Sequence, residues 1–447
     1  MSMVYLEILI LRLKGLPTVI RWCRKVVGAV VSAALIMLGG HEIERPLSAA
    51  VTVDTKASVN LCEGLVSDKR LHPMPSIPKP TPGQTYIDPA FGTTIRRVTN
   101  APSGGVIKPL YSPNQAWNAD ESYLLLYHTG GGKSAGHSLY DGQTYQYLRE
   151  VDIAPADIEQ VYWDPAHPDI FYYVDNSHRG NQRALMQYHV SSGKKKALHT
   201  FACDGDVYAD SHAFVSWDSK VLGLTCRESG GREIFSYDIS TSRESPRTQT
   251  KGKGTPSVAP SGKLFYWNGK VLDERFNEVR TLDLGNPHEH ASLGRLADGR
   301  DTYNEVSFDG KHIGSLVTHV MQDGSVRVII GRRTGYPYPP SGTHVSAVAM
   351  QQPGWVAVSS VGDVSGAGVL DQELYLANTN PGNETVCRVA HHRSWGKEGK
   401  AGYWAEPHVV ISPSGTRLLF GSDWGNSGSV DSYVVELPIY KRGRETR

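Results

Sequence analysis

A strand–turn–strand unit recurs along the chain, and it restricts the possible folds more than any other feature. Its clearest copy runs from His408 to Asp423 and contains a short apolar strand, a Ser-Pro-Ser-Gly turn and a second apolar strand. Similar units begin at Asn114, His212 and Thr255, and weaker ones at Glu159, His290 and His344. The seven starts are about 49 residues apart on average, which is the length of one four-stranded propeller blade. The sequence therefore predicts an all-β, seven-bladed β-propeller.

Strand candidates between the repeats extend this pattern. Residues Glu233–Asp238 and Glu373–Ala377 are strand candidates and are expected to form the third strands of their blades. The fifth repeat has two candidate turns, one ending at Gly299 and one in Val306–Ile313. The blade boundaries between residues 285 and 335 therefore stay open.

The first fifty residues differ from the rest of the chain. Arg21, Arg24 and Lys25 precede an apolar run, Val26–Gly40, and small residues follow it, which is the order found in export signals. The run is about 15 residues long, shorter than the roughly 20 that span a membrane. We expect residues 1–50 to be a cleaved signal or a retained anchor, 51–85 a Pro-rich linker, and 86–440 the propeller of a periplasmic or secreted protein.

Charge and cysteine content exclude several classes of function. The chain has 46 Lys and Arg against 45 Asp and Glu, so no overall field would attract nucleic acid or an anionic membrane. A membrane contact is expected only if the N-terminal segment is an uncleaved anchor. There is no Cys-x-x-Cys pair to bind zinc. Two alternatives stay open for the cysteines: disulfides Cys203–Cys226 and Cys62–Cys387, or four buried free thiols.

The repeat also predicts which side chains meet at one mouth of the central channel, because first strands start and second strands end on the same face. The predicted first-strand starts are Asn114, Glu159, His212, Thr255, His290, His344 and His408. The predicted second-strand ends include His128, Asp175, Arg227 and Asp423. Four of the seven starts are His although the chain has only 17, so imidazoles are concentrated at this mouth.

Three of these histidines indicate a metal site. His290, His344 and His408 come from consecutive repeats, and Glu406 lies two residues before His408, so on an extended strand both side chains point the same way. Neutral imidazoles beside a carboxylate suit a divalent first-row metal, and we expect Mn first, with Zn or Ca as alternatives. The competing interpretation is a wet channel mouth whose histidines only bond to backbone and water.

Other residues at the mouth are candidates for substrate binding, namely Asn114, His128, Glu159 and Trp424. Aromatic rings there can stack on sugars or can pack between blades. No Gly-x-Ser-x-Gly elbow, P-loop, dinucleotide fingerprint or His-Glu-x-x-His helix occurs, which argues against serine hydrolases, nucleotide enzymes and zinc peptidases.

The stretches His391–Ser394 and Tyr403–Gly425 resemble propellers of the oligogalacturonate lyase type. In that family three His and a Gln bind a metal, and two of the His come from a His-Pro-His stretch. Glu406-Pro-His408 matches this stretch with Glu406 in place of a His. Tyr403 falls near the Gln position, and His290 matches the remaining His.

The resemblance implies β-elimination of an acidic oligo- or polysaccharide that contains uronic acid, carried out by a monomeric enzyme. The metal would bind the uronate carboxylate, Arg227 or Arg179 would take the C5 proton, and His212 would transfer the second proton. The alternative is a secreted propeller without catalytic activity that binds a glycan or a protein, because this fold serves many functions.

Overall fold

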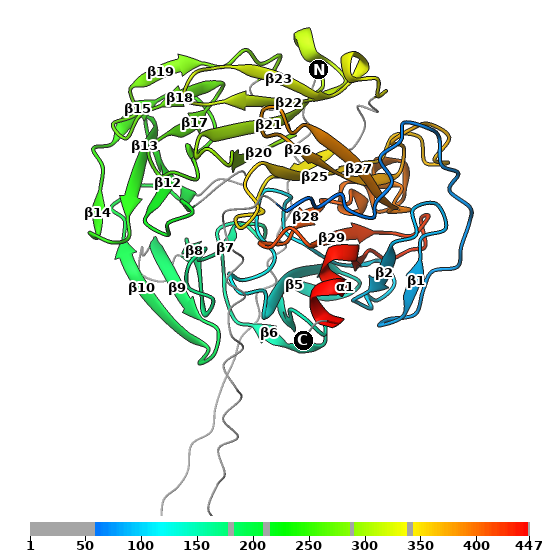
Figure 1. The fold of residues 1–447 in the computed structure, drawn as a ribbon. Helices are drawn as coiled ribbons and strands as arrows, with labels where there is room; N and C mark the ends of the chain where they lie inside the picture. Colours follow the sequence, from blue (N-terminus) through cyan, green and yellow to red (C-terminus); the bar gives the residue numbers. More distant parts are fainter. Residues whose placement is uncertain (1–58, 178–182, 209–214, 287–289, 338–342, 446–447) are drawn as a thin grey trace, which may run out of the picture. The chain divides into compact units, whose positions relative to one another are not determined.

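The computed structural model of the protein describes residues 59–177, 183–208, 215–286, 290–337 and 343–445. In this part of the chain the strands form seven antiparallel sheets, which follow one another around a ring (Figure 1). The predicted seven-bladed propeller is therefore confirmed. Helical structure among the described residues is confined to α1 (Pro438–Glu445) and four short 3-10 turns.

Each of the first four blades is a meander of neighbouring strands. Blade 1 contains β3 (Gly105–Lys108), β4 (Tyr123–Gly130), β5 (Lys133–Asp141) and β6 (Tyr147–Val151), and blade 2 contains β7 (Val161–Trp163), β8 (Ile170–Asp175), β9 (Ala184–His189) and β10 (Lys194–Thr200). Blade 3 contains β11 (Val207–Tyr208), β12 (Val221–Glu228), β13 (Gly231–Asp238) and β14 (Arg243–Glu244), with β15 (Thr248–Thr250) also paired to β13. Blade 4 contains β16 (Ser257–Val258), β17 (Phe265–Trp267), β18 (Lys270–Leu272) and β19 (Glu278–Thr281).

The last three blades include the C-terminal strands. Blade 5 contains β20 (His290–Arg295), β21 (Asp301–Ser307), β22 (Ser315–Val320) and β23 (Val326–Ile330), and blade 6 contains β24 (His344–Ser346), β25 (Trp355–Ser360), β26 (Glu373–Asn378) and β27 (Thr385–His391). Blade 7 contains β28 (Val410–Ile411), β29 (Arg417–Ser422) and β30 (Asp431–Glu436). The 3-10 turns are η1 (Gly310–His312), η2 (Arg332–Thr334), η3 (Gly396–Glu398) and η4 (Gly402–Ala405).

Strands from the two ends of the chain close the ring. β2 (Thr94–Arg97) pairs with β30, and β1 (Thr85–Ile87) pairs with β2, so the N-terminal strands complete blade 7. β30 also contacts β3, and just before β30 the Val430 carbonyl accepts a hydrogen bond from the Ile107 amide at 2.9 Å. Blade 7 and blade 1 are therefore neighbours, and residues about 300 positions apart in the sequence meet at the same mouth.

Apolar side chains of neighbouring blades pack face to face and form the core. Leu125 of β4 and Phe171 of β8, for example, belong to one buried cluster between blades 1 and 2. Such burial is the main stabilising contribution in a sheet-on-sheet packing.

The described part of the Pro-rich segment, from Val59 onward, packs on the propeller. Leu61 is fully buried in the core cluster of blades 6 and 7, and Val66 bridges to Arg388 of β27. Cys62 is bonded to Cys387, also in β27. This segment is thus held against the last blades by apolar, backbone and covalent contacts.

Both cysteine pairs named from the sequence form disulfides. The Cα atoms are 5.6 Å apart in Cys62–Cys387 and 5.8 Å apart in Cys203–Cys226, within the range of native disulfides. The disulfide alternative is therefore confirmed over the free thiols.

The structure also settles the strand register. β13 and β26 are third strands, as predicted. In blade 5 the turn between the first two strands ends near Gly299, whose amide donates to the Leu296 carbonyl at 2.9 Å, and Val306–Ile313 leads instead into η1 and the third strand.

Two predicted first-strand starts are wrong. In blade 1 the inner strand is β3, so Asn114 follows that strand and Lys108 ends it. In blade 3 the inner strand is β11, which comes before His212 in the sequence. In both blades the segment that resembles the other repeats makes only an isolated bridge to the second strand, Trp117 with Leu124 and Val215 with Leu222, and the regular inner strand lies before it.

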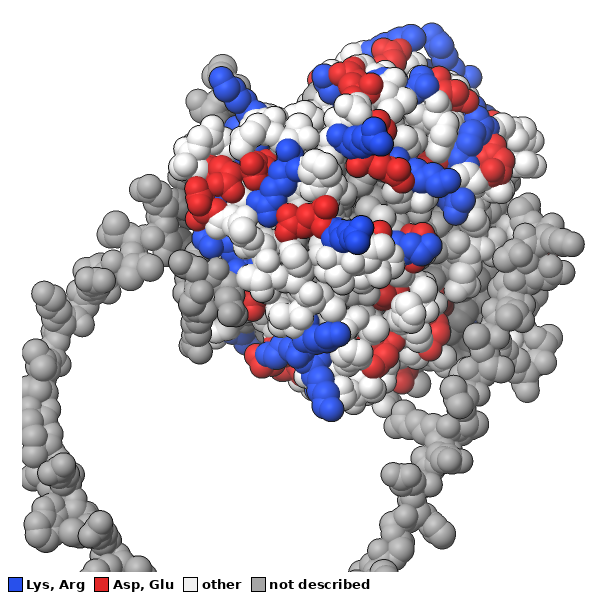
Figure 2. All heavy atoms as spheres, turned by 90° about the vertical axis from the view of Figure 1, so that its left-hand side faces the viewer, with Lys and Arg blue, Asp and Glu red and all other residues white. Residues whose placement is uncertain are grey.

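The surface carries charges of both signs. Figure 2 shows Lys and Arg interspersed with Asp and Glu on the side formed by the outer strands of the middle blades, in agreement with the net charge of +1. In the described ranges, no helix is long and apolar enough to cross a membrane.

Candidate metal site at the channel mouth

Three polar side chains from blades 6 and 7 converge at the mouth. His344 is the first residue of β24, and Glu406 and His408 precede β28. The carboxylate Oε2 of Glu406 lies 3.6 Å from His344 Nε2 and 3.7 Å from His408 Nε2. All three residues are at most 1% exposed. Three of the four predicted metal ligands are thus brought together.

The backbone that places Glu406 and His408 differs from the predicted extended strand. His408 has φ +45°, in the left-handed region that is uncommon for a residue with a side chain, and β28 begins only at Val410. Pro407 fixes the turn between the two ligands. The donor atoms meet through this turn, and the strand alternation used in the sequence argument does not apply here.

His290 lies beside this group. Its ring stacks on His344 with centroids 4.2 Å apart and planes 15° apart. Its Nδ1 is 2.7 Å from the Thr343 carbonyl oxygen, which can only accept a hydrogen bond, so Nδ1 carries the hydrogen. In the neutral ring Nε2 is then the basic atom. Among the described residues at this mouth, the ligand atoms that lie within 4.8 Å of one another are those of His344, Glu406 and His408, without His290.

Lys108 is a site residue that the sequence argument missed. Its side chain is fully buried, and its ammonium donates to the Glu406 carbonyl at 2.6 Å and lies 2.9 Å from His408 Nδ1. A Cβ on Gly421 would lie 3.2 Å from the Lys108 Cβ, so this glycine makes room for the lysine. Burial lowers the pKa of Lys108 to about 7, opposed by the charges of Glu159 and Glu406. In the sequence, Lys108 could have been recognised as a site residue because it ends the apolar stretch Gly105–Lys108.

Glu159 and Tyr403 form a second polar group at this mouth. The Tyr403 hydroxyl lies 3.2 Å from both carboxylate oxygens of Glu159, and the Asn114 amide donates to the Glu159 carbonyl at 2.7 Å. Burial raises the pKa of Glu159, and the Lys108 charge opposes this. Ring closure makes blades 7, 1 and 2 consecutive, so the charges of Glu159 and Glu406 both act on Lys108.

Burial also sets the protonation of the cluster. It lowers the pKa of both His344 and His408 well below the ordinary value, and neighbouring positive charge adds to this for each of them. Both rings are therefore neutral and keep a lone pair for a metal.

Several donor atoms at the centre of the cluster lack hydrogen bonds. Among the described residues, both nitrogens of His344, Nε2 of His408 and Oε1 of Glu406 have no hydrogen-bond partner, although Oε1 faces the exposed Lys397 ammonium at 3.3 Å. Buried polar atoms are normally satisfied. Two imidazole nitrogens and a carboxylate form a donor set that fits a divalent first-row metal.

The remaining predicted residues lie apart from this cluster. The His128 ring is 2.8 Å from the Glu150 carboxylate within blade 1. Trp424 is 7% exposed, stacks on Tyr433 and donates to the Ile77 carbonyl, so the packing alternative describes it. Arg227 is exposed on β12, with its guanidinium 5.3 Å from the Tyr208 ring centre. His212 and Arg179 lie outside the described residues, and their roles stay predictions.

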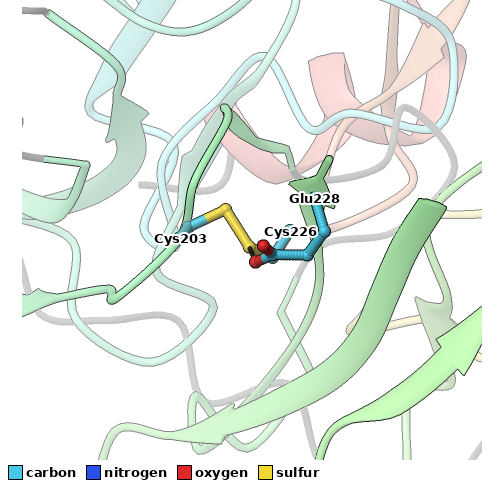
Figure 3. A group of neighbouring side chains, drawn as sticks. All are labelled: Cys203, Cys226 and Glu228. Carbon is cyan, nitrogen blue, oxygen red and sulfur yellow. Dashed lines mark hydrogen bonds between the residues drawn. A yellow bond between two sulfur atoms is a disulfide. The ribbon is translucent and has the colours of Figure 1, made fainter. Parts of the chain in front are cut away.

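Cys203, Cys226 and Glu228 also bring possible ligand atoms together (Figure 3). The two sulfurs are bonded to each other, and a disulfide sulfur is not the thiolate that binds metals. This group therefore has no set of metal ligands.

Comparisons with known proteins place the architecture. No family model matches the chain, and no curated protein matches its sequence. An oligogalacturonate lyase solved in complex with manganese aligns over 81% of this chain and 98% of its own, with 18% identity and a TM-score of 0.57. The oligogalacturonate lyase of Vibrio parahaemolyticus aligns over 79% and 96%, with 15% identity and a TM-score of 0.58. The chain has the oligogalacturonate lyase fold.

At this identity the likeness establishes the fold, which the resemblance in the last repeat had led us to expect. A shared propeller leaves the activity open, since function depends on the residues of the site. The His344–Glu406–His408 cluster is the part of this oligogalacturonate lyase fold from which a function can be argued.

Proposed function

We propose that the protein is a metal-assisted polysaccharide lyase that cleaves a uronic-acid-containing oligo- or polysaccharide by β-elimination. The observation that carries this proposal is the buried cluster of His344, Glu406 and His408, whose central donor atoms lack hydrogen bonds among the described residues. The likeness to an oligogalacturonate lyase solved with manganese supports the choice of reaction and metal.

His344, Glu406 and His408 would hold the divalent ion, with Mn preferred and Zn or Ca as alternatives. When bound, the ion supplies positive charge that stabilises the uronate carboxylate as negative charge develops on it. Lys108 fixes the orientation of His408 and of the Glu406 backbone, and Gly421 leaves space for its side chain.

We add His290 to the candidates for taking the C5 proton. Its Nδ1–H donates to the Thr343 carbonyl. Its stacking on His344 keeps the ring beside the metal ligands. Arg227, Arg179 and His212 remain the alternatives that the family resemblance implies for the two proton transfers.

The proposal also includes an exported location and an acidic glycan as substrate. Two disulfides support an oxidising compartment, so we assign the protein to the periplasm or the exterior, and we propose separately that it acts as a monomer. Glu159, Asn114 and His128 would contact an acidic glycan at the mouth, and Trp424 would only support the last blade.

A binding propeller without catalytic activity is the second candidate. Glu406 replaces a family His, and Tyr403 stands near a family Gln with its hydroxyl committed to Glu159. These two departures favour binding over catalysis, so they need a direct test.

The test combines metal analysis with an assay of unsaturated uronide, measured by its ultraviolet absorbance, on several uronic-acid polysaccharides. Wild type is compared with His408→Ala and with His189→Ala, a half-exposed histidine of blade 2. Bound metal and product that only His408→Ala abolishes support the lyase. Binding of the same polymers without product supports the second candidate.

A further inference from the structure

The face opposite the histidine mouth has a groove of about 640 Å³ between the first turns of blades 3, 4 and 5. Trp217, Pro260 and Leu264 form its apolar wall, and Ser261, Arg300 and Gln322 are among its polar lining residues. Trp217 and Pro260 also line a second, smaller cavity together with Pro113 and Met350. A volume in the range of about 300–1,000 Å³ is typical of small-ligand sites.

Trp217 is half-buried at the edge of this groove. Its backbone amide donates to the Pro260 carbonyl at 3.0 Å, and both residues line the groove. Aromatic carbon surface of this kind suits the apolar faces of sugar rings.

Charges around the groove cancel in pairs. Asp218 pairs with Lys220 at 2.9 Å, and Arg300 pairs with Asp298 at 2.7 Å and with Asp323 at 2.8 Å. Arg295 lies across the strand pair from the buried Asp301. With Lys263, the set holds four cations and four carboxylates. An anionic ligand therefore gains little net attraction, whereas hydroxyl groups find donors and acceptors side by side.

We infer that this groove is a second carbohydrate site, which binds neutral sugar units of a polysaccharide on the turn face. It goes beyond the proposed lyase and does not rest on it, because none of its residues belongs to the histidine mouth. Trp217 supplies the stacking surface, and Arg300 and Lys263 supply hydrogen bonds to hydroxyl groups, whereas both ends of the Gln322 amide are bonded to Asp301.

Native affinity electrophoresis of the full chain in gels containing galactan, xylan or glucomannan tests the inference, with polygalacturonate gels in parallel. We expect at least one neutral polymer to slow the wild type. Trp217→Ala should weaken that retention about tenfold, as for a stacked aromatic anchor. Lys263→Ala, at an exposed position, should weaken it about fivefold through one lost hydrogen bond.

Two controls separate this site from other effects. Tyr147→Ala removes a 53% exposed aromatic ring of blade 1, and His408→Ala removes a ligand of the mouth; both should keep the wild-type retention. Retention by polygalacturonate alone, retention by no polymer, or equal retention of Trp217→Ala, Lys263→Ala and wild type would each overturn the inference. Loss of lyase activity would leave it unaffected.

Discussion

The two halves of the histidine mouth differ in how deeply they bury their polar side chains. On the arc formed by blades 6, 7 and 1, His344, Glu406, His408 and Lys108 are at most 1% exposed. On the arc of blade 3, the described candidate Arg227 is exposed to solvent. Removal from water strengthens electrostatic interactions and leaves donor atoms for a ligand, whereas an exposed guanidinium stays hydrated. The chemistry is therefore expected on the first arc.

The two disulfides give the largest expected contrast between the arcs. Cys62–Cys387 joins residues 325 positions apart at blade 6, and Cys203–Cys226 joins residues 23 apart at blade 3. On chain entropy, replacing the first pair by Ser should cost about 5 kcal/mol of unfolding free energy and the second about 3 kcal/mol. Denaturant unfolding of both double variants measures this. Equal losses of unfolding free energy would show that the longer loop closed by Cys62–Cys387 adds no extra stability.

The two arcs should also differ in their contribution to metal affinity. His344→Ala or His408→Ala removes a nitrogen donor and should weaken binding of Mn by at least about 100-fold, while Arg227→Ala should leave it unchanged. Isothermal titration with Mn on the purified protein gives both values. Wild-type affinity in His408→Ala would place the ion elsewhere.

The acid sensitivity of the folding stability should also come from the arc of blades 6, 7 and 1. Burial lowers the pKa of His392, next to β27, from 6.5 to about 3. As the pH falls, His392 takes up a proton in the unfolded chain before it does so in the folded protein. The unfolding free energy therefore decreases as the pH falls below 6.5 toward 3. His392→Gln should flatten this loss by about 2 kcal/mol at mildly acidic pH. Urea midpoints at neutral and acidic pH measure it; an unchanged slope in the variant would contradict the assignment.

The smallest expected effect compares two cationic side chains. Lys108→Met leaves the Glu406 carbonyl and His408 Nδ1 without their donor and should lower the unfolding free energy by about 1–2 kcal/mol. Arg227→Met, at an exposed position, should change it by less than about 0.5 kcal/mol. Thermal unfolding of the two variants decides this. A more stable Lys108→Met would mean that the desolvation cost of the buried ammonium exceeds its bonds.

Much of the fold could be predicted from the repeat, because each blade is a local meander whose strands and turns lie close in the sequence. The same repeat placed His344 and His408 at one mouth. It failed at blades 1 and 3, where the first strand lies before the predicted starts Asn114 and His212. It also gave no account of Lys108, whose contact with His408 joins opposite ends of the chain.

The amino-acid sequence by itself determined the seven blades, the concentration of imidazoles at the mouth and the cysteines available for pairing. Only the tertiary structure decided which of these side chains meet. Closure of the ring by β2 brings Lys108 onto His408 across 300 positions, and the left-handed backbone of His408 turns its ring toward Glu406. Contacts of this range depend on how blades pack against one another, which local periodicity does not encode.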